Sequence, residues 1–417
     1  MGRIIGIRHR VKKTAEGESR PTLVAIMEDG FTRHLELEDE QSELDFVFGK
    51  FPIAMRHVED GEDLNIFPEH HKIERKKTGS EEKEIRVPLA YEGLRGGDKV
   101  VMILGGSGDP LAYALARRGQ EIGARVLRIP GFQLSARRGE STKEVDHNTL
   151  IWIFEKNPEF FYEFGPADRD NIMVSELHRA RREAQQARIG CEQRLRQALI
   201  GKIFLSEEGG YPEGTIADAF KGMMKKDSVY QALKKEEEDR TKELRKAVHK
   251  LPIWQKFLLD VEGCGEVLAA GIISPIIDIR MFRSKRKLKA FCGAHVLPDG
   301  RFARKRAGTT ANWNPRARQA LFLLGDQFNK RAGSEWGLKL REYKAKFRAK
   351  HPVVECSACA VAWENCSKAP GKKHTKRYTD GHIHKMTIWR TLTKFVERLH
   401  KEWKHLDAGE KREEAAA

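Results

Sequence analysis

The sequence predicts an α/β domain followed by an all-α region that contains an antiparallel coiled coil. Three observations support this prediction: short β-type runs near the N-terminus, a hydrophobic period that switches from 2 to 3.6 and back over residues 99–129, and a highly charged helical composition from 167 to 251. With 417 residues, the chain is long enough for two or three domains that each bury a core. A single small module is therefore excluded.

The N-terminal part has the pattern of a sheet. Short β-type runs separated by Gly, Ser and Pro clusters predict three consecutive antiparallel strands. These runs are 4–11, 22–27 and 31–37. Further on, 99–104 predicts a buried strand, 109–123 an amphipathic helix and 124–129 another strand. The polar stretch 65–87 predicts an inserted loop or hairpin with little core. This order is typical of the α/β layer of the ribonuclease H and RuvC fold.

The middle of the chain predicts two long charged helices with a Gly-Gly and Pro212 in the segment that connects them. Five apolar residues of the second helix lie on roughly heptad spacing, which favours a protruding antiparallel coiled coil. They are Val229, Leu233, Leu244, Val248 and Leu251. A solvated helical bundle without a ligand is the alternative, because charge runs on helices usually face water.

These patterns divide the chain into four parts. The predicted parts are the α/β domain at 1–165, the coiled coil at 166–251, a helical nucleic-acid-binding domain at 252–405 with a Cys/His insert at 353–377, and a disordered tail at 406–417. In the third part, Gly263 and Gly265 form a tight turn that opens an apolar helix, as in a helix-hairpin-helix. Asn314 followed by Pro315 predicts the start of a core helix.

Charge and hydropathy restrict the partners. A net charge of +16 and a pI near 9.5 predict a polyanionic partner. The longest apolar run, 267–277, is too short to span a bilayer and contains Pro275. The first residues lack the apolar core of a signal peptide. We therefore expect a cytoplasmic protein without a membrane segment.

The densest positive charge flanks residues 298–300. Each neutralised phosphate releases counterions, so such a patch suits a nucleic-acid backbone, and the interleaved Phe282, Phe291, Phe302 and Trp313 suit stacked bases. The predicted phosphate ligands are Lys285, Arg286, Lys287, Lys289, Arg301, Arg304, Lys305 and Arg306, with Arg179, Arg182 and Arg194 on the coiled coil steering the nucleic acid. A solvated basic face is the alternative.

The six cysteines are too few and too scattered for a secreted disulfide framework. Three of them, Cys356, Cys359 and Cys366, precede His374. Together these four residues supply ligands compatible with tetrahedral zinc. Reduced cysteines in a surface loop are the alternative. Substitute candidates for the fourth ligand are His351, His382 and His384.

Carboxylates for a two-metal nuclease are poorly supplied. Such a site needs acids from the first strand, from the end of the fourth strand and from a later helix. The candidates are Asp109, Glu144 and Asp146. The first strand instead carries Arg8, and on one helix Glu144 and Asp146 would point about 200° apart, so they could not share a metal. We expect Mg²⁺ only if this domain is active.

Three segments of the helical region resemble a known family. They read Gly263-Cys-Gly-Glu-Val-Leu-Ala-Ala-Gly, Arg283-Ser-Lys-Arg-Lys-Leu-Lys-Ala-Phe-Cys-Gly-Ala and Asn314-Pro-Arg-Ala-Arg-Gln-Ala-Leu. This pattern resembles the C-terminal domain of the RuvC-like (DEDD), bridge-RNA-guided insertion-sequence transposases. That family carries four metal-binding acids and a nucleophilic Ser. The matching positions here hold Arg8, Gly105 with Gly106, Lys143 with Asp146, and Asp299 before Gly300. Only Asp146 matches, so the resemblance implies that DNA strand transfer is lost.

Because it lacks those residues, the chain is more similar to the Tas proteins of TIGR-Tas systems. The C-terminal part of the Tas proteins resembles the Nop domain of box C/D ribonucleoproteins. The segment Tyr378-Thr-Asp-Gly-His-Ile-His before a closing helix at 386–403 also looks like this group. The resemblance implies a homodimeric, RNA-guided ribonucleoprotein whose guide RNA recognises target DNA by base pairing, with a RuvC-like domain that does not cleave. The alternatives are an active RNA-guided nuclease or transposase of the same superfamily and a nucleic-acid-binding scaffold without guide RNA.

Overall fold

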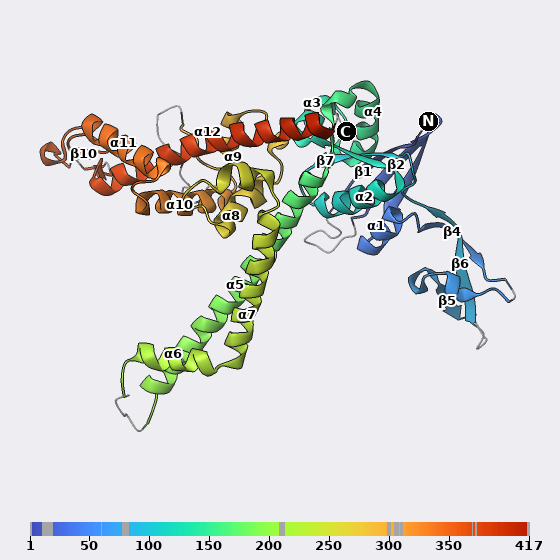
Figure 1. The fold of residues 1–417 in the computed structure, drawn as a ribbon, viewed down its shortest axis with the longest axis horizontal. Coiled ribbons are helices and arrows are strands. Elements are labelled where there is room, and N and C mark those ends of the chain that lie inside the picture. The colour runs from blue at the N-terminus through green and yellow to red at the C-terminus, as the bar shows by residue number, and fades with distance from the viewer. Residues whose placement is uncertain are drawn as a thin grey trace. The chain divides into compact units, whose positions relative to one another are not determined.

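A computed structural model describes residues 2–10, 20–59, 61–76, 83–207, 213–297, 302–303, 308, 312–368, 370–371 and 373–414. The chain divides into two compact units, Met1–Arg169 and Asp170–Ala417, and each is described by itself (Figure 1). The first unit is mixed α/β and the second is mainly helical. The predicted succession of an α/β part and a helical part is confirmed.

The described residues of unit 1 build a sheet with the strand order β3-β2-β1-β7-β8-β9. The strands are β1 (Ile4–Arg8), β2 (Thr22–Glu28), β3 (Phe31–Leu37), β7 (Lys99–Leu104), β8 (Arg125–Pro130) and β9 (Tyr162–Glu163). The first three pair antiparallel, as predicted, while β1, β7 and β8 run parallel and β9 returns antiparallel. The parallel strands are apolar and buried, because helices cover the sheet.

Helices connect and cover this sheet. They are α1 (Glu40–Val47), α2 (Asp109–Ile122), α3 (Gly131–Arg137) and α4 (Asp146–Lys156). The crossover from β7 to β8 is α2, which ends at Gly123 with φ +80, a left-handed conformation that favours glycine. On β1, a Cβ atom at Gly6 would lie 2.0 Å from the carbonyl oxygen of His147, so this glycine is what lets α4 lie close to the strand.

The polar stretch 65–87, predicted as an inserted loop or hairpin, forms a hairpin of two antiparallel strands. It contains β5 (Ile73–Lys76) and the start of β6 (Lys83–Glu92), which pair antiparallel with β4 (Phe51–His57) in the order β4-β6-β5. Its side chains are polar, but Val87 is fully buried and His71 is nearly so. The sequence pattern did not indicate the third strand of this sheet, because β4 lies outside the polar stretch.

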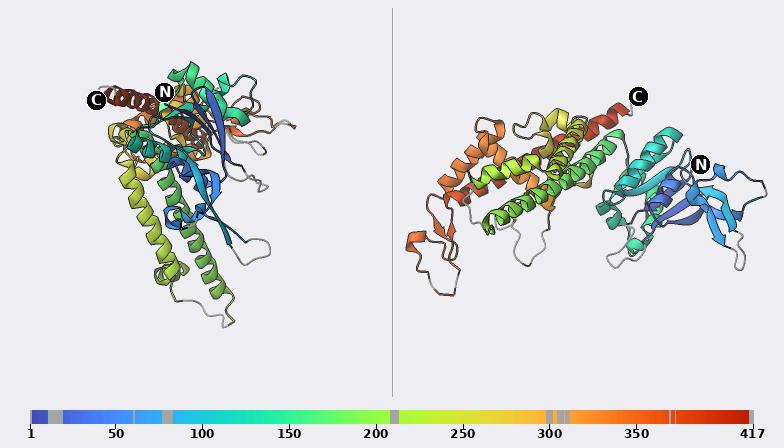
Figure 2. Two further views of the ribbon diagram at one scale, coloured as in Figure 1. Left: turned by 90° about the vertical axis from the view of Figure 1, so that its right-hand side faces the viewer. Right: turned by 90° about the horizontal axis from the view of Figure 1, so that it is seen from below.

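In unit 2, α5 (Pro166–Phe204) and α7 (Ser228–Val248) run side by side as a long hairpin, with α6 (Ile216–Lys226) at its far end (Figures 1 and 2). The Arg181 guanidinium contacts Thr241 and Glu237, and the Arg188 guanidinium contacts Glu237 at 2.6 Å, so the pair is antiparallel. This seam is largely ionic. The predicted heptad residue Val229 is 59 % exposed, whereas Leu244 and Val248 are fully buried.

The remaining helices of unit 2 surround one apolar core. They are the π-helical turn Trp254–Leu258, α8 (Glu266–Ile276), α9 (Lys285–Phe291), α10 (Pro315–Lys330), α11 (Glu335–Lys350) and α12 (Asp380–Glu414). The turn before α8 holds Gly263 at φ +88, where a Cβ would lie 2.8 Å from Gln327 Cβ on α10. At Gly325, a Cβ would lie 2.6 Å from Ile388 Cγ2, so glycine permits the close packing of α10 on α12.

The predicted disordered tail at 406–417 is wrong over most of its length, because α12 continues to Glu414. The reason is tertiary: Leu406 packs against the core, and the Asp407 carboxylate lies 3.7 Å from the Arg280 guanidinium. Residues 415–417 lie outside the described residues. Among the described helices, none has the length and apolar character needed to cross a membrane.

Candidate nucleic-acid interface and metal centre

The basic helix α9 presents cations to solvent. Lys285, Arg286 and Lys287 are exposed, while Leu288 on the opposite face is fully buried in the core. Within the described part of the chain, no ion pair engages these three cations. Lys289 differs, because its ammonium lies 2.7 Å from the Glu397 carboxylate of α12. The first three are therefore the predicted phosphate ligands whose charge is uncompensated here.

The rest of the predicted patch is only partly described. Arg301, Arg304, Lys305 and Arg306 lie outside the described residues, as do Asp299 and Gly300. Of the aromatic rings predicted to stack on bases, Phe282 is not accessible to a base. Phe282 is buried, with its ring centroid 5.0 Å from that of the partly buried Phe291, which packs against the core. These rings hold α9 on the core instead of offering a free face.

Sequence reasoning missed Arg318, which organises this region from α10. Its guanidinium lies between the rings of Trp313 and Trp389, 4.6 and 4.0 Å from their centroids. It also donates hydrogen bonds to the carbonyl oxygens of Gly293 and Ala303, the latter at 2.8 Å. Burial lowers the pKa of Arg318. The side chain thus ties both ends of segment 293–303 to α10, and only its spacing after the helix start at Asn314 hinted at this position.

The predicted cations of the hairpin differ in their surroundings. Arg179 pairs locally with Glu176 and lies 4.0 Å from Glu183. Arg194 is exposed and Arg182 is half-buried, and neither takes part in an ion pair within the described residues. Local compensation makes Arg179 the weakest of the three as a phosphate ligand.

A second positive spot lies where α5 meets α10. Burial and the neighbouring Arg182, Arg181 and Arg316 lower the pKa of His178 to about 4. His178 is therefore neutral at pH 7, and the exposed Arg316 adds its charge to that of Arg182. No pattern in the sequence indicated that Arg182 and Arg316 lie near each other, because they belong to different helices.

In unit 1, each of the candidate carboxylates is paired with an arginine. Arg8 donates to Glu144 at 2.9 and 3.2 Å, and this hydrogen bond lowers the pKa of Glu144. Asp109 is buried and paired with the buried Arg128. Asp146, also buried, receives two hydrogen bonds of 2.7 and 2.8 Å from Arg138.

These three acids do not converge on one point in the described residues. None belongs to a described group of side chains that could hold a metal ion. Glu144 lies in a 3₁₀ turn just before α4 with its side chain 62 % exposed, whereas Asp146 opens α4 with its side chain 3 % exposed. A Mg²⁺ ion needs oxygen ligands at about 2.1 Å, and each carboxylate is already engaged by a guanidinium.

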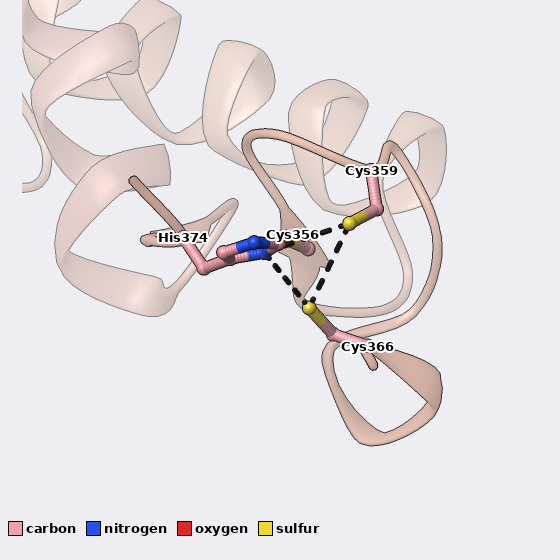
Figure 3. A group of neighbouring side chains, drawn as sticks. All are labelled: Cys356, Cys359, Cys366 and His374. Atoms are coloured by element: carbon pink, nitrogen blue, oxygen red, sulfur yellow. Dashed lines mark hydrogen bonds between the residues drawn. The ribbon is translucent and has the colours of Figure 1, made fainter. Parts of the chain in front are cut away.

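The four predicted zinc ligands come together (Figure 3). Their ligand atoms, from Cys356, Cys359, Cys366 and His374, all lie within 4.8 Å of one another. The Sγ atoms of Cys359 and Cys366 are 3.8 Å apart, and His374 Nδ1 lies 3.2 to 3.5 Å from the three sulfurs. Zinc bonds of about 2.3 Å to sulfur and 2.0 Å to nitrogen give tetrahedron edges of about 3.5 to 3.8 Å. The cluster could therefore bind a metal such as zinc.

Local backbone structure forms this cluster. Strands β10 (Glu355–Cys356) and β11 (Lys376–Arg377) pair and bring the first ligand beside the last. Burial raises the pKa of the Cys356 thiol, but amide hydrogen bonds from Cys359 and Ala358, with Cys366 and His374 nearby, lower it to about 6. A thiolate at neutral pH is what a metal requires.

Other cysteines of unit 2 do not resemble these. Burial alone raises the pKa of Cys264 and of Cys292 to about 12, so both thiols stay protonated in the apolar core.

The comparison with known families falls on the helical core of unit 2. Residues 255–337 match the family model of the IS116/IS110/IS902 transposases. This transposase-like segment contains α8, α9 and Arg318. The match relates the chain to that family over less than half of its length. No curated protein matches the chain.

Proposed function

We propose that this chain is a guide-RNA-binding protein that forms a ribonucleoprotein, recognises DNA by RNA base pairing and uses its RuvC-like unit 1 as an architectural part without nuclease activity. The RNA is held by the transposase-like segment and the α5–α7 hairpin. Specificity comes from base pairing, while the protein contacts the phosphate backbone. By analogy with the TIGR-Tas proteins and their Nop-like domain, the assembly is a homodimer.

The proposal that unit 1 does not cleave DNA rests on the pairing of every candidate carboxylate with an arginine. A two-metal nuclease needs carboxylates that neutralise about four positive charges. Here Glu144 is held by Arg8, Asp109 by Arg128 and Asp146 by Arg138. Each carboxylate is thus already paired without any metal, and bringing Mg²⁺ to Asp109 or Asp146 would require breaking a buried ion pair.

The nucleic-acid part rests on charge and on the family match. The chain carries 16 more cations than anions, and the uncompensated cations of α9 lie inside the segment that matches the transposases. The Cys₃His cluster is proposed to hold zinc, which would fix the chain between α11 and α12. The alternative, an active RNA-guided nuclease or transposase, requires Mg²⁺ and at least one of these carboxylates released from its arginine.

The test is purification of the full-length protein with its native locus, followed by sequencing of any bound nucleic acid. We expect a discrete small RNA. The variant K285E/R286E/K287E should not co-purify with this RNA. When RNA is added back, the slope of log affinity against log salt concentration should be shallower by about 2 to 3 in the variant, since each phosphate contact contributes about 0.7 to 0.9 to the slope. The matched control R341E/K346E/K350E makes the same charge change on exposed residues of α11, outside the transposase-like segment and the hairpin, and should retain the RNA.

The same complex is then incubated with matching DNA and Mg²⁺. DNA that is bound but uncut supports the proposal. Cleavage or joining would support the alternative and overturn the architectural role of unit 1. A folded α9 variant that keeps full-length RNA would overturn the assignment of α9, and a wild-type protein without RNA would leave only a scaffold.

A further inference from the structure

A second group of metal-type ligands lies in unit 1, far from the Cys₃His cluster in sequence. It consists of Asp45 on α1 and of His70 and His71 in the 3₁₀ turn Glu69–His71. One ligand atom from each of the three lies within 4.8 Å of those of the others. The turn belongs to the polar stretch between β4 and β6, so the group joins the inserted three-stranded sheet to the main part of unit 1.

The geometry is convergent. His71 Nε2 lies 2.9 Å from Asp45 Oδ2, and His70 Nε2 lies 3.2 Å from each carboxylate oxygen of Asp45. The two imidazole centroids are 4.2 Å apart. Both rings therefore direct the same nitrogen towards one carboxylate, although they are neighbours in sequence. Bonds of about 2.0 Å to nitrogen and to carboxylate oxygen would place tetrahedral ligand atoms about 3.3 Å apart, close to these distances.

Neighbouring side chains complete an outer shell. Gln41 Nε2, one turn earlier on α1, donates to Asp45 Oδ1 at 3.0 Å. Tyr91 on β6 has its hydroxyl oxygen 3.4 Å from His71 Nδ1, the ring nitrogen that faces away from the carboxylate. Metal-ligating histidines are usually oriented by such a partner on their second nitrogen.

Burial separates an inner side from an open side. The side chains of Asp45 and His71 are 12 % and 3 % exposed, whereas that of His70 is 45 % exposed. A metal ion would therefore have two shielded ligands and one ligand, His70, on the exposed side.

We propose that Asp45, His70 and His71 bind a divalent transition-metal ion, zinc being the ion that this ligand set suits best. Two imidazoles and one carboxylate are a recurrent protein ligand set for such ions, which bind neutral imidazole and ionised carboxylate. The metal clamps the turn before β5 onto α1. It thereby fixes the inserted sheet, in which Val87 and Glu92 are buried.

The test is a Co²⁺ titration of the metal-stripped full chain. Cobalt bound by thiolates gives intense sulfur-to-metal charge-transfer absorption, whereas cobalt bound by nitrogen and oxygen gives only weak visible bands. We expect two equivalents to bind. The variant H70Q/H71Q should bind one equivalent with full charge-transfer absorption, and C356S/C359S should bind one equivalent without it. The control H34Q/H57Q replaces two exposed histidines of the same unit and should bind two.

The outcomes separate the two metal sites. An H70Q/H71Q protein that binds as much cobalt as the wild type would overturn this proposal, as would a wild type that binds a single equivalent with full charge-transfer absorption, because the three side chains would then form only hydrogen bonds. A wild type that binds one equivalent without charge transfer would instead support this site and overturn the Cys₃His site. Circular dichroism of metal-stripped H70Q/H71Q establishes that the variant is folded.

Discussion

The substitution Asp146→Asn distinguishes an arginine-paired carboxylate from a metal ligand. In a cluster of metal-binding acids without metal, removing one negative charge relieves repulsion and leaves stability unchanged or higher. In unit 1 it should do the opposite, because Asp146 receives two hydrogen bonds from Arg138 at 2.7 and 2.8 Å. The amide of asparagine can accept only one of these with its oxygen.

The magnitude follows from burial. The side chain of Asp146 is 3 % exposed and that of Arg138 is 14 % exposed. Removing one partner of a buried pair costs about 3 to 5 kcal/mol, since the other charge is left uncompensated. Because Arg138 can still reach some water, we expect the lower end, about 3 kcal/mol.

The assay is native-state hydrogen exchange of the α4 amides in the full-length protein. A loss of about 3 kcal/mol should speed their exchange roughly 150-fold where it reports the opening of this region. As a control, Asp239→Asn removes an exposed carboxylate that pairs with Lys242 on α7, and it should leave exchange unchanged. Slower or unchanged exchange of α4 in Asp146→Asn, together with protection of the wild type by Mg²⁺, would refute the pairing and restore a metal site.

Further predictions concern unit 2. Removing the proposed zinc ion with a chelator, or replacing Cys366 by Ser, should expose the amides of 355–377 to exchange while α10 stays protected, as measured by mass spectrometry. His178 has a folded pKa of about 4 and an unfolded value near 6.5, so its contribution to stability is complete above pH 6.5 and is lost as the pH falls towards 4. The loss is at most about 3 kcal/mol, and the pH profile of the unfolding free energy should be flatter by this amount in His178→Gln. Arg318→Lys keeps the charge but loses the planar guanidinium that donates two hydrogen bonds. Urea unfolding should show a free energy of unfolding lower by about 2 kcal/mol. Equal stability would contradict the role of Arg318 in tying segment 293–303 to α10.

Sequence patterns predicted the elements that depend on residues close together in the sequence. The first three strands alternate in hydropathy and are separated by turn residues, so their pairing could be predicted before any tertiary contact was known. The Cys₃His group was accessible for the same reason, because four ligands within nineteen residues can converge through one short hairpin. The helix start at Asn314 likewise depends on two adjacent residues.

The features that the sequence did not predict depend on residues that are distant in sequence. The pairing of β6 with β4 was not predicted, because β4 lies outside the polar stretch 65–87. Arg318 reads as one more surface cation until Trp389 of α12 covers it. Asp45 lies 25 residues before His70, and no spacing rule connects an acid on one helix with two histidines in a distant turn. Side-chain convergence of this kind is set by tertiary packing.

The ionic seam between α5 and α7 makes unit 2 respond to salt in two opposite ways. Glu237 holds Arg181 and Arg188 at 2.7 and 2.6 Å, and screening by added ions weakens such pairs. The helical core around α8, α10 and α12 is apolar, and a salt such as sulfate, which is excluded from protein surfaces, strengthens it. Raising the sulfate concentration therefore loosens the hairpin while it tightens the core from which the hairpin projects.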